Sequence, residues 1–437
     1  MELKTFRGGI HPPYQKEATA NKPTVDISLP AEVVIPMQQH VGAPNNPMVG
    51  LGDRVVAGQK IGESEAFISA PVHSSVSGTV KAIEDRPNFT GALVKSVVIT
   101  VDQSQPAGWA ERRDTANLTP EQIREIAKNA GIVGMGGAAF PTSVKLSPPK
   151  DKPIDTVIVN GCECEPFLTC DHRLMMEMPD EMIAGLRLMM RAVGAGKGVI
   201  GIEANKMDAV QALSAKTAAD PDLEVVVLEV RYPEGAEKML IEAVTGRRVP
   251  PGKLPSEVGV LVQNVQSAVA LFEAAASGKP VVERVVTVTG PGIAEPKNVR
   301  VKIGTPIEHV IRECGGIAGA PGKVIIGGPM TGWAQKDLSA SVVKGTSGIL
   351  VLTKEMVEAG DERDCVGCDK CLDVCPMFLT PNFIVKHARR GQWAMADKYG
   401  ARDCFECGCC SYVCPAMIPH VAYVRKAKAE IAAADKK

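Results

Sequence analysis

Two runs of cysteines near the C-terminus are the residues of this chain best suited to chemistry. They span Cys365–Pro376 and Cys404–Pro415, and each has the spacing Cys-x2-Cys-x2-Cys-x3-Cys-Pro. This spacing is typical of [4Fe–4S] ligation, because three thiolates of one short loop reach three irons of a cube. The fourth cysteine lies too far along the chain and crosses to the other cluster. We therefore predict two clusters, the first held by Cys365, Cys368, Cys371 and Cys414 and the second by Cys404, Cys407, Cys410 and Cys375.

Other uses of paired cysteines fit the sequence less well. A zinc ribbon takes two Cys-x-x-Cys pairs, whereas each run here has four cysteines and ends in Cys-Pro. The 13 cysteines are clustered, which argues for metal ligation in a reducing compartment and against a disulfide scaffold. Cys409 is an additional thiol in the second run, and its Cys-x-Cys spacing fits ligation less well than that of Cys410.

Composition limits the remaining function classes. A chain of 437 residues with 45% hydrophobic and 23% charged residues can form three or more domains. Its net charge of −1 gives no indication of a nucleic-acid partner or a polybasic membrane patch. The opening Met1–Thr5 lacks the apolar region of a signal peptide, and no run of about 18 apolar residues occurs. We expect a cytosolic enzyme or a peripheral subunit with no transmembrane segment of its own.

Local patterns predict a multidomain α/β protein with four parts. Residues 1–115 are β-rich, and Ala70–Val80 resembles the turn and strand of lipoyl-type barrel-sandwich domains. Residues 116–280 alternate strands and helices, which predicts a Rossmann-like α/β core with a largely parallel sheet. Residues 281–354 place one helix among short strands and are typical of an α+β unit of β-grasp type, and residues 355–437 are expected to be a helical, ferredoxin-like domain with two clusters.

The expected elements follow from strand and helix signals. Strands are predicted at 32–35, 54–56, 78–83, 96–101, 156–159, 199–202, 224–230, 284–289, 298–301 and 323–326. Thr119 is a plausible N-cap with Pro120 at the first helical position. Further helices are predicted at 180–193, 206–219, 234–244, 306–313, 383–398 and 421–433. We interpret His40 and His73 as satisfied loop residues, and Gly196–Gly201 as a turn because it precedes a strand instead of following one.

A glycine-rich loop at Gly131–Lys145 is the candidate source of electrons for the clusters. Closely spaced glycines let backbone amides approach a phosphate, and Lys145 would add a positive charge. Taken alone, this pattern also fits an ordinary turn. The segment Asn160–Pro166 follows a predicted parallel strand, and ligands of open α/β sheets bind at that end of the strands. Together the two segments predict a cofactor site.

These segments resemble the flavin-binding subunit of respiratory complex I and its relatives. The resemblance implies cofactor contacts at Gly134, Gly136, Gly137, Ala138, Phe140, Thr142, Lys145, Asn160, Glu163, Glu165, Tyr232, Gly235, Glu237 and Asn264. The sequence departs from that family at Met135, Cys162 and Ala236, where the family has Arg, Asp and Glu. Glu163, Glu165 and Glu237 would contact the nicotinamide ribose or shape hydride approach, or would simply be solvated. Phe140 would stack on a ring or pack under the loop.

A resemblance over nearly the whole chain is to the RnfC family, the flavin- and NADH-binding subunits of the Rnf electron-transport complexes. It rests on the opening Phe6–Pro13, the barrel-sandwich segment, the flavin segments, the β-grasp unit and the cysteine runs, in this order. It implies bound FMN, NADH (NAD(H)) oxidation and two [4Fe–4S] clusters. It also implies membrane-embedded and ferredoxin-binding partner subunits, and a peripheral place at the cytoplasmic face of a bacterial or archaeal cell membrane.

This interpretation makes the chain an NADH dehydrogenase subunit of a translocase complex, with no side chain needed as a general base. Two alternatives stay open. One is a soluble NADH-dependent reductase of another acceptor, such as the cobalamin reductases that share this domain order; the other is a non-catalytic electron wire. Cys162, Cys164 and Cys170 are interpreted as buried or flavin-adjacent thiols, because a third cluster would need a fourth cysteine nearby and Cys314 is the only other candidate outside the runs.

Overall fold

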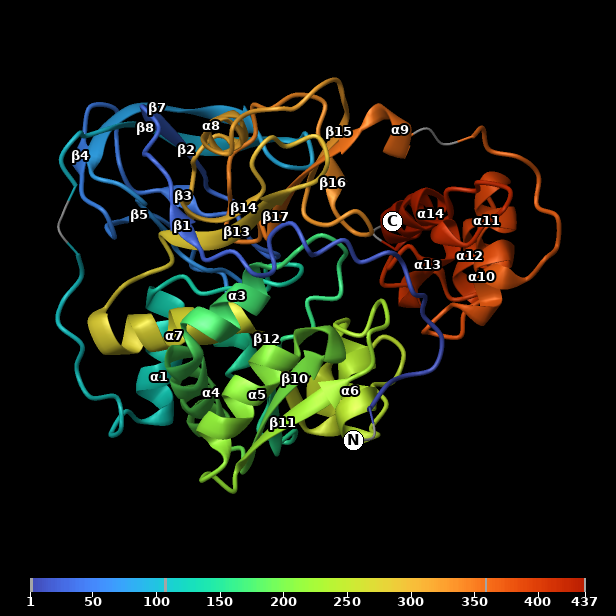
Figure 1. Ribbon diagram of the computed structural model, residues 1–437, viewed down its shortest axis with the longest axis horizontal. Helices are drawn as coiled ribbons and strands as arrows, with labels where there is room; N and C mark the ends of the chain where they lie inside the picture. The colour runs from blue at the N-terminus through green and yellow to red at the C-terminus, as the bar shows by residue number, and fades with distance from the viewer. Residues whose placement is uncertain (1–2, 106–107, 358–359, 436–437) are drawn as a thin grey trace.

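The computed structural model describes residues 3–105, 108–357 and 360–435. In Figure 1 the β-rich parts of the chain lie above an α/β core, and the cysteine-rich helical part lies beside both. The blue N-terminal segment runs between the β-rich parts and the core and passes the cysteine-rich part before reaching the N-terminus. Residues far apart in the sequence therefore meet where these parts adjoin.

The N-terminal part consists of two small antiparallel sheets that share one core. One sheet has the order β2-β8-β7-β4 and the other β3-β5-β6. Their strands are β2 (Glu32–Pro36), β3 (Asn46–Pro47), β4 (Arg54–Val55), β5 (Lys60–Glu63), β6 (Val72–His73), β7 (Gly78–Pro87) and β8 (Leu93–Val101). Val33, Ile35, Ile61 and Ile99 are fully buried between the sheets, because β-branched side chains suit a pleated, half-buried surface. The four strands predicted here are confirmed.

The α/β core is a parallel sheet with the order β11-β10-β9-β12. Its strands β9 (Thr156–Asn160), β10 (Lys197–Glu203), β11 (Leu223–Leu228) and β12 (Val260–Asn264) are apolar along their length, as strands covered on both faces are. Helices α1 (Pro120–Asn129), α4 (Pro179–Val193) and α7 (Val265–Ser277) contribute to the core on one face, and α6 (Glu237–Thr245) to the core on the other. The core also contains α2 (Thr142–Lys145), α3 (Cys170–Glu177), η1 (Ala204–Lys206), α5 (Met207–Thr217) and η2 (Pro255–Val258).

Most predicted elements of the core are confirmed, and three elements longer than four residues were missed. Thr119 caps α1 in a complete capping box with Gln122, with Pro120 in the first turn. The missed elements are α3, β12 and α7, because short apolar runs do not separate strand from helix until the sheet is assembled. The interpretation of Gly196–Gly201 as a turn was wrong, since Lys197 already begins β10.

A mixed six-stranded sheet follows, with the order β1-β14-β13-β17-β15-β16. It contains β1 (Val25–Asp26), β13 (Glu283–Thr289), β14 (Lys297–Lys302), β15 (Pro321–Ile326), β16 (Trp333–Ala334) and β17 (Gly348–Thr353). Helix α8 (Ile307–Glu313) packs its apolar side chains against the sheet. The three strands and the helix predicted here are confirmed. Strand β17 lies between β13 and β15 and was missed.

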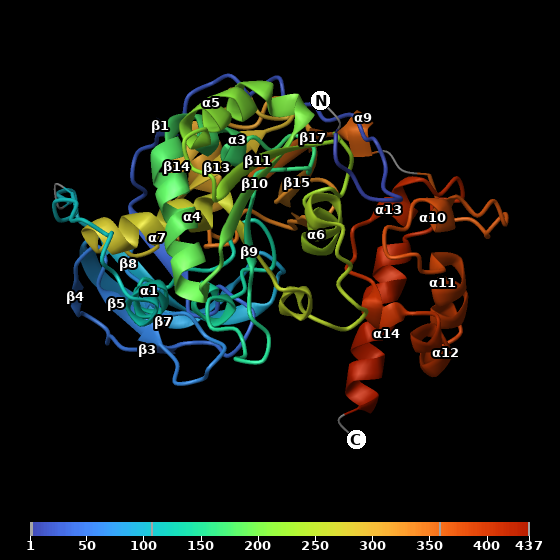
Figure 2. The ribbon, with the colours of Figure 1, turned by 90° about the horizontal axis from the view of Figure 1, so that it is seen from below.

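The cysteine-rich part is helical. It follows α9 (Lys354–Val357) and contains α10 (Lys370–Asp373), α11 (Pro381–Arg389), α12 (Trp393–Lys398), η3 (Ala401–Asp403), α13 (Cys409–Tyr412) and α14 (His420–Ala434). The prediction of one helix over 383–398 was wrong: α11 ends at Arg389, and Gly391 adopts a φ of 66°, which breaks the helix. Figure 2 shows α14 beside α11 and α12. Among the described residues, no helix combines the length and apolar character needed to cross a membrane.

Candidate functional site

A cleft of about 770 Å³ lies at the carboxyl ends of the parallel strands. Asn160 is the last residue of β9 and Asn264 the last of the neighbouring β12, and the two are paired in register. The loop after β11 brings Tyr232 to Gly235 to the same edge. Cofactor sites of open α/β sheets occupy this position, and a cleft of this volume is in the range of small-molecule sites.

The structure brings nine of the residues implied by the flavin-subunit resemblance to this cleft. They are Gly136, Gly137, Ala138, Asn160, Glu163, Glu165, Tyr232, Gly235 and Asn264. The other five do not line the cleft; they are Gly134, Phe140, Thr142, Lys145 and Glu237. Gly134 donates its amide to the Phe140 carbonyl and closes the glycine loop, and Thr142 is buried at the start of α2. Lys145 Nζ lies 2.6 Å from Glu237 Oε1 and donates to the Val262 carbonyl, so its contact with a phosphate stays a prediction.

The glycine loop leaves room for a ligand and also fits the core tightly. A Cβ on Gly137 would have no atom within 4 Å, whereas a Cβ on Gly136 would lie 2.5 Å from Asn264 Nδ2. Gly136, Gly137 and Ala138 are exposed at the cleft. The loop thus presents backbone to the cleft on one side, as a phosphate-binding loop does.

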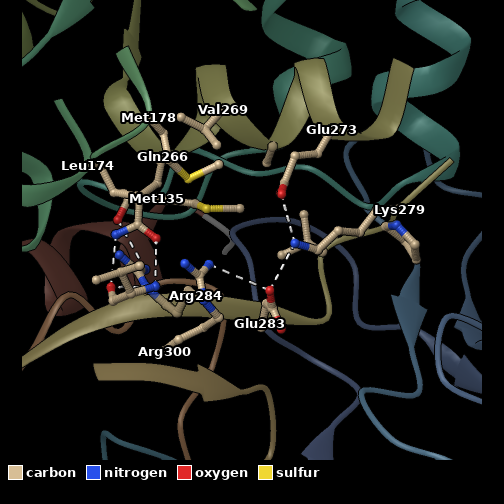
Figure 3. Close-up of a pocket in the computed structure, with 14 residues that line it drawn as sticks. Met135, Leu174, Met178, Gln266, Val269, Glu273, Lys279, Glu283, Arg284 and Arg300 are labelled. Carbon is tan, nitrogen blue, oxygen red and sulfur yellow. Dashed lines mark hydrogen bonds and ion pairs between the residues drawn. The ribbon is translucent and has the colours of Figure 1, made fainter. Parts of the chain in front are cut away.

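Beneath the loop, Met135 occupies the position where the flavin-subunit family has Arg. The guanidinium group of Arg284 lies next to this position instead. Met135 is buried, and Arg284 of β13, also buried, donates to the Met135 and Lys344 carbonyls. A separate cavity here has only about 40 Å³, room for water but not for a flavin. Figure 3 shows this cavity, with Lys279 between Glu273 and Glu283.

The two glutamates of the β9 loop hold backbone groups. The Glu163 carboxylate accepts from the amides of Asp171 and His172 at the start of α3. Glu165 accepts from the amides of Met330 and Thr331 in the loop between β15 and β16. Burial raises the pKa of Glu165, although these hydrogen bonds oppose the shift. Both carboxylates therefore shape the cleft wall, and their contact with a ribose stays a prediction.

Lys16 fixes this wall from below and was not predicted from the sequence. Its buried ammonium donates to the carbonyls of Glu163, Glu165 and Leu168 at 2.8, 2.9 and 2.6 Å. Burial lowers the pKa of Lys16, with a further contribution from the positive charge of Lys206. No sequence signal distinguishes this lysine, because its three acceptors lie about 150 residues away along the chain.

Asp171 is the strongest structural sign that the cleft takes a polar ligand, and it too was missed. It is 7% exposed and lines the cleft; its Oδ2 accepts from Asn264 Nδ2 at 2.6 Å, while its Oδ1 has no hydrogen-bond partner. Burial, followed by the charge of Glu163, raises the pKa of Asp171 to about 7. Buried polar atoms without partners are rare. An orphaned acceptor beside an open glycine loop fits a cofactor that carries both N–H or O–H donors and a phosphate, as FMN does.

Loops from every other part of the chain complete the cleft. They were not expected at the site, because no local pattern predicts which loops a domain interface brings together. The additional lining residues include Gln38, His40, Gly42, Phe89, Cys164, Cys170, Gly328, Thr331, Trp333, Thr346 and Phe405. The prediction that His40 is satisfied is confirmed, since its Nε2 accepts from the Ala70 amide. His73 is buried, but its Nδ1 has no partner among the described residues, so that interpretation was wrong in part.

The predicted ligands of the first cluster line one small hollow of the cysteine-rich part. Cys365, Cys368, Cys371 and Cys414 surround it, although Cys414 belongs to the second run. Cys365 and Cys368 are exposed, so this set reaches the surface. Burial raises the pKa of Cys371 to about 11. A cluster must therefore displace a firmly held proton there, and iron supplies the charge that does so.

The predicted ligands of the second cluster are better shielded. Cys375, Cys407 and Cys410 are buried and Cys404 is half-buried. Burial raises the pKa of Cys404 to about 11, with Cys407 and Cys375 as neighbouring charges that raise it further. Burial also raises the pKa of Cys410, again with Cys407, Cys404 and Cys375 as neighbours. Thiols from both runs thus meet at each set, as crossed ligation requires.

The remaining cysteines are not among the predicted ligands, although the Cys409 thiol lies within hydrogen-bonding reach of the Cys407 thiol. Cys409 is fully buried, and its Sγ lies 4.0 Å from the Tyr232 carbonyl oxygen. Cys162 and Cys170 are buried and Cys164 is half-buried, with Cys164 and Cys170 lining the cleft. The interpretation of Cys162 and Cys170 as buried thiols is confirmed, and the adjacency of these cysteines to a flavin stays a prediction.

Family models match the chain in the same order as its parts. They are the RnfC barrel sandwich hybrid domain at residues 4–104, the Nuo51 FMN-binding domain at 127–273, the SLBB domain at 285–334 and the 4Fe-4S dicluster domain at 362–418. The RnfC subunit of the Na+-translocating ferredoxin:NAD+ oxidoreductase complex from Acetobacterium woodii is 48% identical over 99% of this chain and 98% of the relative. The chain belongs to the RnfC family.

Two further relatives support this membership. The corresponding subunit of a proton-translocating ferredoxin:NAD+ oxidoreductase complex from Clostridium ljungdahlii is 45% identical over 87% of this chain and 84% of the relative. That of an ion-translocating oxidoreductase complex from Rhodobacter capsulatus is 39% identical over 99% and 84%. A solved NAD+-reducing [NiFe]-hydrogenase in the H2-reduced state aligns with a TM-score of 0.51 over 73% of this chain and 62% of that one, at 21% identity, and shows similarity of fold.

In this RnfC protein the cleft and the second cysteine set are in direct contact. The buried Tyr232 lines the cleft, and its hydroxyl donates to the Cys407 carbonyl at 2.7 Å. Phe405, between two of the predicted ligands, also lines the cleft. A second contact joins the cleft lining to the cysteine-rich part: the Arg425 guanidinium of α14 lies 4.6 Å from the centroid of the ring of Trp333, which lines the cleft. A short protein path therefore joins the cleft to the second set.

Proposed function

We propose that this chain is the peripheral subunit through which an ion-translocating ferredoxin:NAD+ oxidoreductase exchanges electrons with NADH. FMN occupies the cleft, and two [4Fe–4S] clusters occupy the two cysteine sets with the crossed ligation given above. When bound, FMN exchanges a hydride with NADH and the clusters carry the electrons one at a time. The observation that carries the proposal is the Tyr232–Cys407 hydrogen bond, because it places the cofactor cleft directly against a set of cluster thiols.

The chain's own residues bind and orient. Gly136 and Gly137 admit a phosphate close to the backbone, and the orphaned Asp171 Oδ1 accepts a hydrogen bond from the ligand. Asn264 holds Asp171 and caps α7, which fixes both against the glycine loop. The Lys16 clamp keeps the opposite wall in place. No side chain has to move a proton for hydride exchange to occur, so positioning is the work of the protein.

The exposure of the thiols suggests the direction in which partners dock. The second set is shielded beside the cleft, whereas Cys365 and Cys368 of the first set are exposed. Membrane-embedded and ferredoxin-binding subunits of the same complex would exchange electrons at this exposed set. Peripheral attachment to the cytoplasmic face of the cell membrane follows from such partners. The relatives are named as translocating Na+ or protons, so the coupling ion of this chain is open.

Anaerobic reconstitution tests the proposal. The protein is loaded with iron, sulfide and FMN, the flavin and iron contents are counted, and NADH is added while absorbance is followed. We expect one FMN and two clusters per chain, and bleaching of both. If FMN does not bind or bleach while the clusters are intact, the proposal is refuted and the non-catalytic electron wire is the interpretation that remains. Copurification with hydrophobic subunits separates the translocase from a soluble reductase of another acceptor.

A further inference from the structure

The segment Phe6–Ile10 lies between the flavin cleft and the cysteine-rich part and bonds to both. Ile10 exchanges two backbone hydrogen bonds with Tyr232 at 2.8 and 2.9 Å, on the wall of the cleft. The adjacent Gly9 donates its amide to the Val374 carbonyl at 3.0 Å, next to Cys375. Two successive residues thus tie the strand end that carries Tyr232 to the loop that carries a predicted cluster ligand. Figure 1 shows this blue segment passing the cysteine-rich part.

Both glycines of this segment are required by the space and by the backbone. Gly9 has a φ of +77°, and a Cβ there would lie 2.6 Å from the Tyr232 carbonyl oxygen and 2.8 Å from Phe6 Cζ. Gly8 has a φ of +96°, and a Cβ there would lie 3.2 Å from the Cys375 carbonyl oxygen and from Pro376 Cα. A side chain at either position would force the two walls apart.

Arginines of the α/β core and of the segment itself add further contacts at this junction. Arg231, beside Tyr232, donates from Nη1 to the Phe6 and Gly8 carbonyls, both at 3.1 Å. The Arg7 guanidinium lies 5.7 Å from the Phe378 ring of the cysteine-rich part, and that of Arg248 lies 5.8 Å from the same ring. The ring is thus held by one cation from the segment and one from the α/β core.

Residues 360–370, which lead into the cysteine-rich part, do not fix its position against the cleft. All residues from 360 to 370 are exposed, so this stretch contributes little packing to the junction. The distance between the cleft and the second cysteine set is therefore set by non-covalent contacts. Among them, the hydrogen bonds of Gly9 and Ile10 reach both walls with backbone alone, and backbone contacts allow the smallest gap.

We propose that Phe6–Ile10, the glycine strap, is a positioning element that holds Cys375 and its cluster against the Tyr232 edge of the flavin cleft and so fixes the gap that electrons cross. The proposal rests on the proposed function, in which electrons pass between these two sites. Electron transfer between redox centres weakens exponentially with their separation, so a wider gap between the cleft and the second cysteine set slows cluster reduction. The strap would therefore control the rate of cluster reduction without contacting NADH or the flavin.

The test compares Gly9→Ala with Gly52→Ala in the holoprotein. Gly52 has a φ of +84° but open space around a Cβ, so the control carries the same backbone strain without the collision. Anaerobic stopped-flow absorbance after NADH addition follows flavin and clusters separately. We expect wild-type flavin reduction in both variants, and cluster reduction slowed several-fold in Gly9→Ala only.

Hydrogen exchange supplies a readout that needs no electron donor. The amides of residues 374–378 should exchange faster in Gly9→Ala and at the wild-type rate in Gly52→Ala. If Gly9→Ala does not fold, Arg231→Ala takes its place with Arg231→Lys as the conservative variant, and we expect the same changes with partial recovery in Arg231→Lys. Wild-type cluster reduction and exchange in the strap variants would overturn the proposal. Failure of NADH to bleach the wild-type flavin would instead refute the proposed function and leave the exchange test of the strap intact.

Discussion

Replacing Lys16 by methionine should open the wall of the flavin cleft. Methionine has a similar length but no charge, so the three carbonyls of Glu163, Glu165 and Leu168 lose their shared donor. Each buried carbonyl left without a partner costs about 1–3 kcal/mol. The substitution also recovers the several kcal/mol spent on burying an ammonium group. We therefore expect a net penalty of about 3 kcal/mol on the closed conformation of this loop.

The effect should appear in flavin affinity. If the penalty makes the closed conformation of the loop a minor state, only that fraction of the protein can bind FMN. The apparent Kd for FMN then rises in inverse proportion to the population of the closed conformation, by up to about 100-fold. Fluorescence quenching of FMN on titration with the protein measures this Kd, and hydrogen exchange of residues 163–168 reports the loop itself. Lys22→Met is the matched control, because Lys22 is exposed and donates to a single carbonyl, that of Pro296, at 3.0 Å. Unchanged affinity and exchange in Lys16→Met, or equal weakening in the control, would refute the reasoning.

Three further substitutions test the site. Cys375→Ser should abolish the cluster of the second run while Cys409→Ser retains it, as iron content and EPR of the reduced protein would show; a normal cluster content in Cys375→Ser contradicts crossed ligation. Gly137→Ala should weaken FMN binding and leave the midpoint of urea unfolding unchanged, because its Cβ enters the cleft and meets no protein atom; tight binding would exclude the loop as the phosphate site. Asp171 has a pKa raised from 3.8 to about 7, so its contribution to stability is complete below pH 3.8 and is lost as pH rises through 7. Unfolding free energy of the flavin-free protein should thus fall by roughly 2 kcal/mol from pH 5 to pH 8, and Asp171→Asn should remove this slope; an equal slope in the variant would assign it to other groups.

Local signals were sufficient for much of the fold and for part of the site. The N-cap at Thr119, most strands of the core and the helix near 307–313 were predicted because each depends on neighbours within a few residues. The single helix predicted over 383–398 failed at Gly391, where the backbone takes a positive φ that periodicity does not reveal. Strands β12 and β17 were missed, because a short apolar run becomes a strand only when a sheet offers it an edge.

The cysteine spacing, and with it the class of cofactor, can be read from the chain without a fold, because three ligands of a cluster come from one short loop. The glycine loop and the asparagine that ends β9 can be read in the same way, since each is a local feature of the backbone. The contacts that these features make depend on how the folded parts are arranged. Lys16 reaches carbonyls about 150 residues away, Tyr232 bonds a carbonyl 175 residues away, and Gly9 lies against Tyr232 and Val374 at once. Such contacts depend on how separately folded parts dock, and no local propensity encodes that geometry.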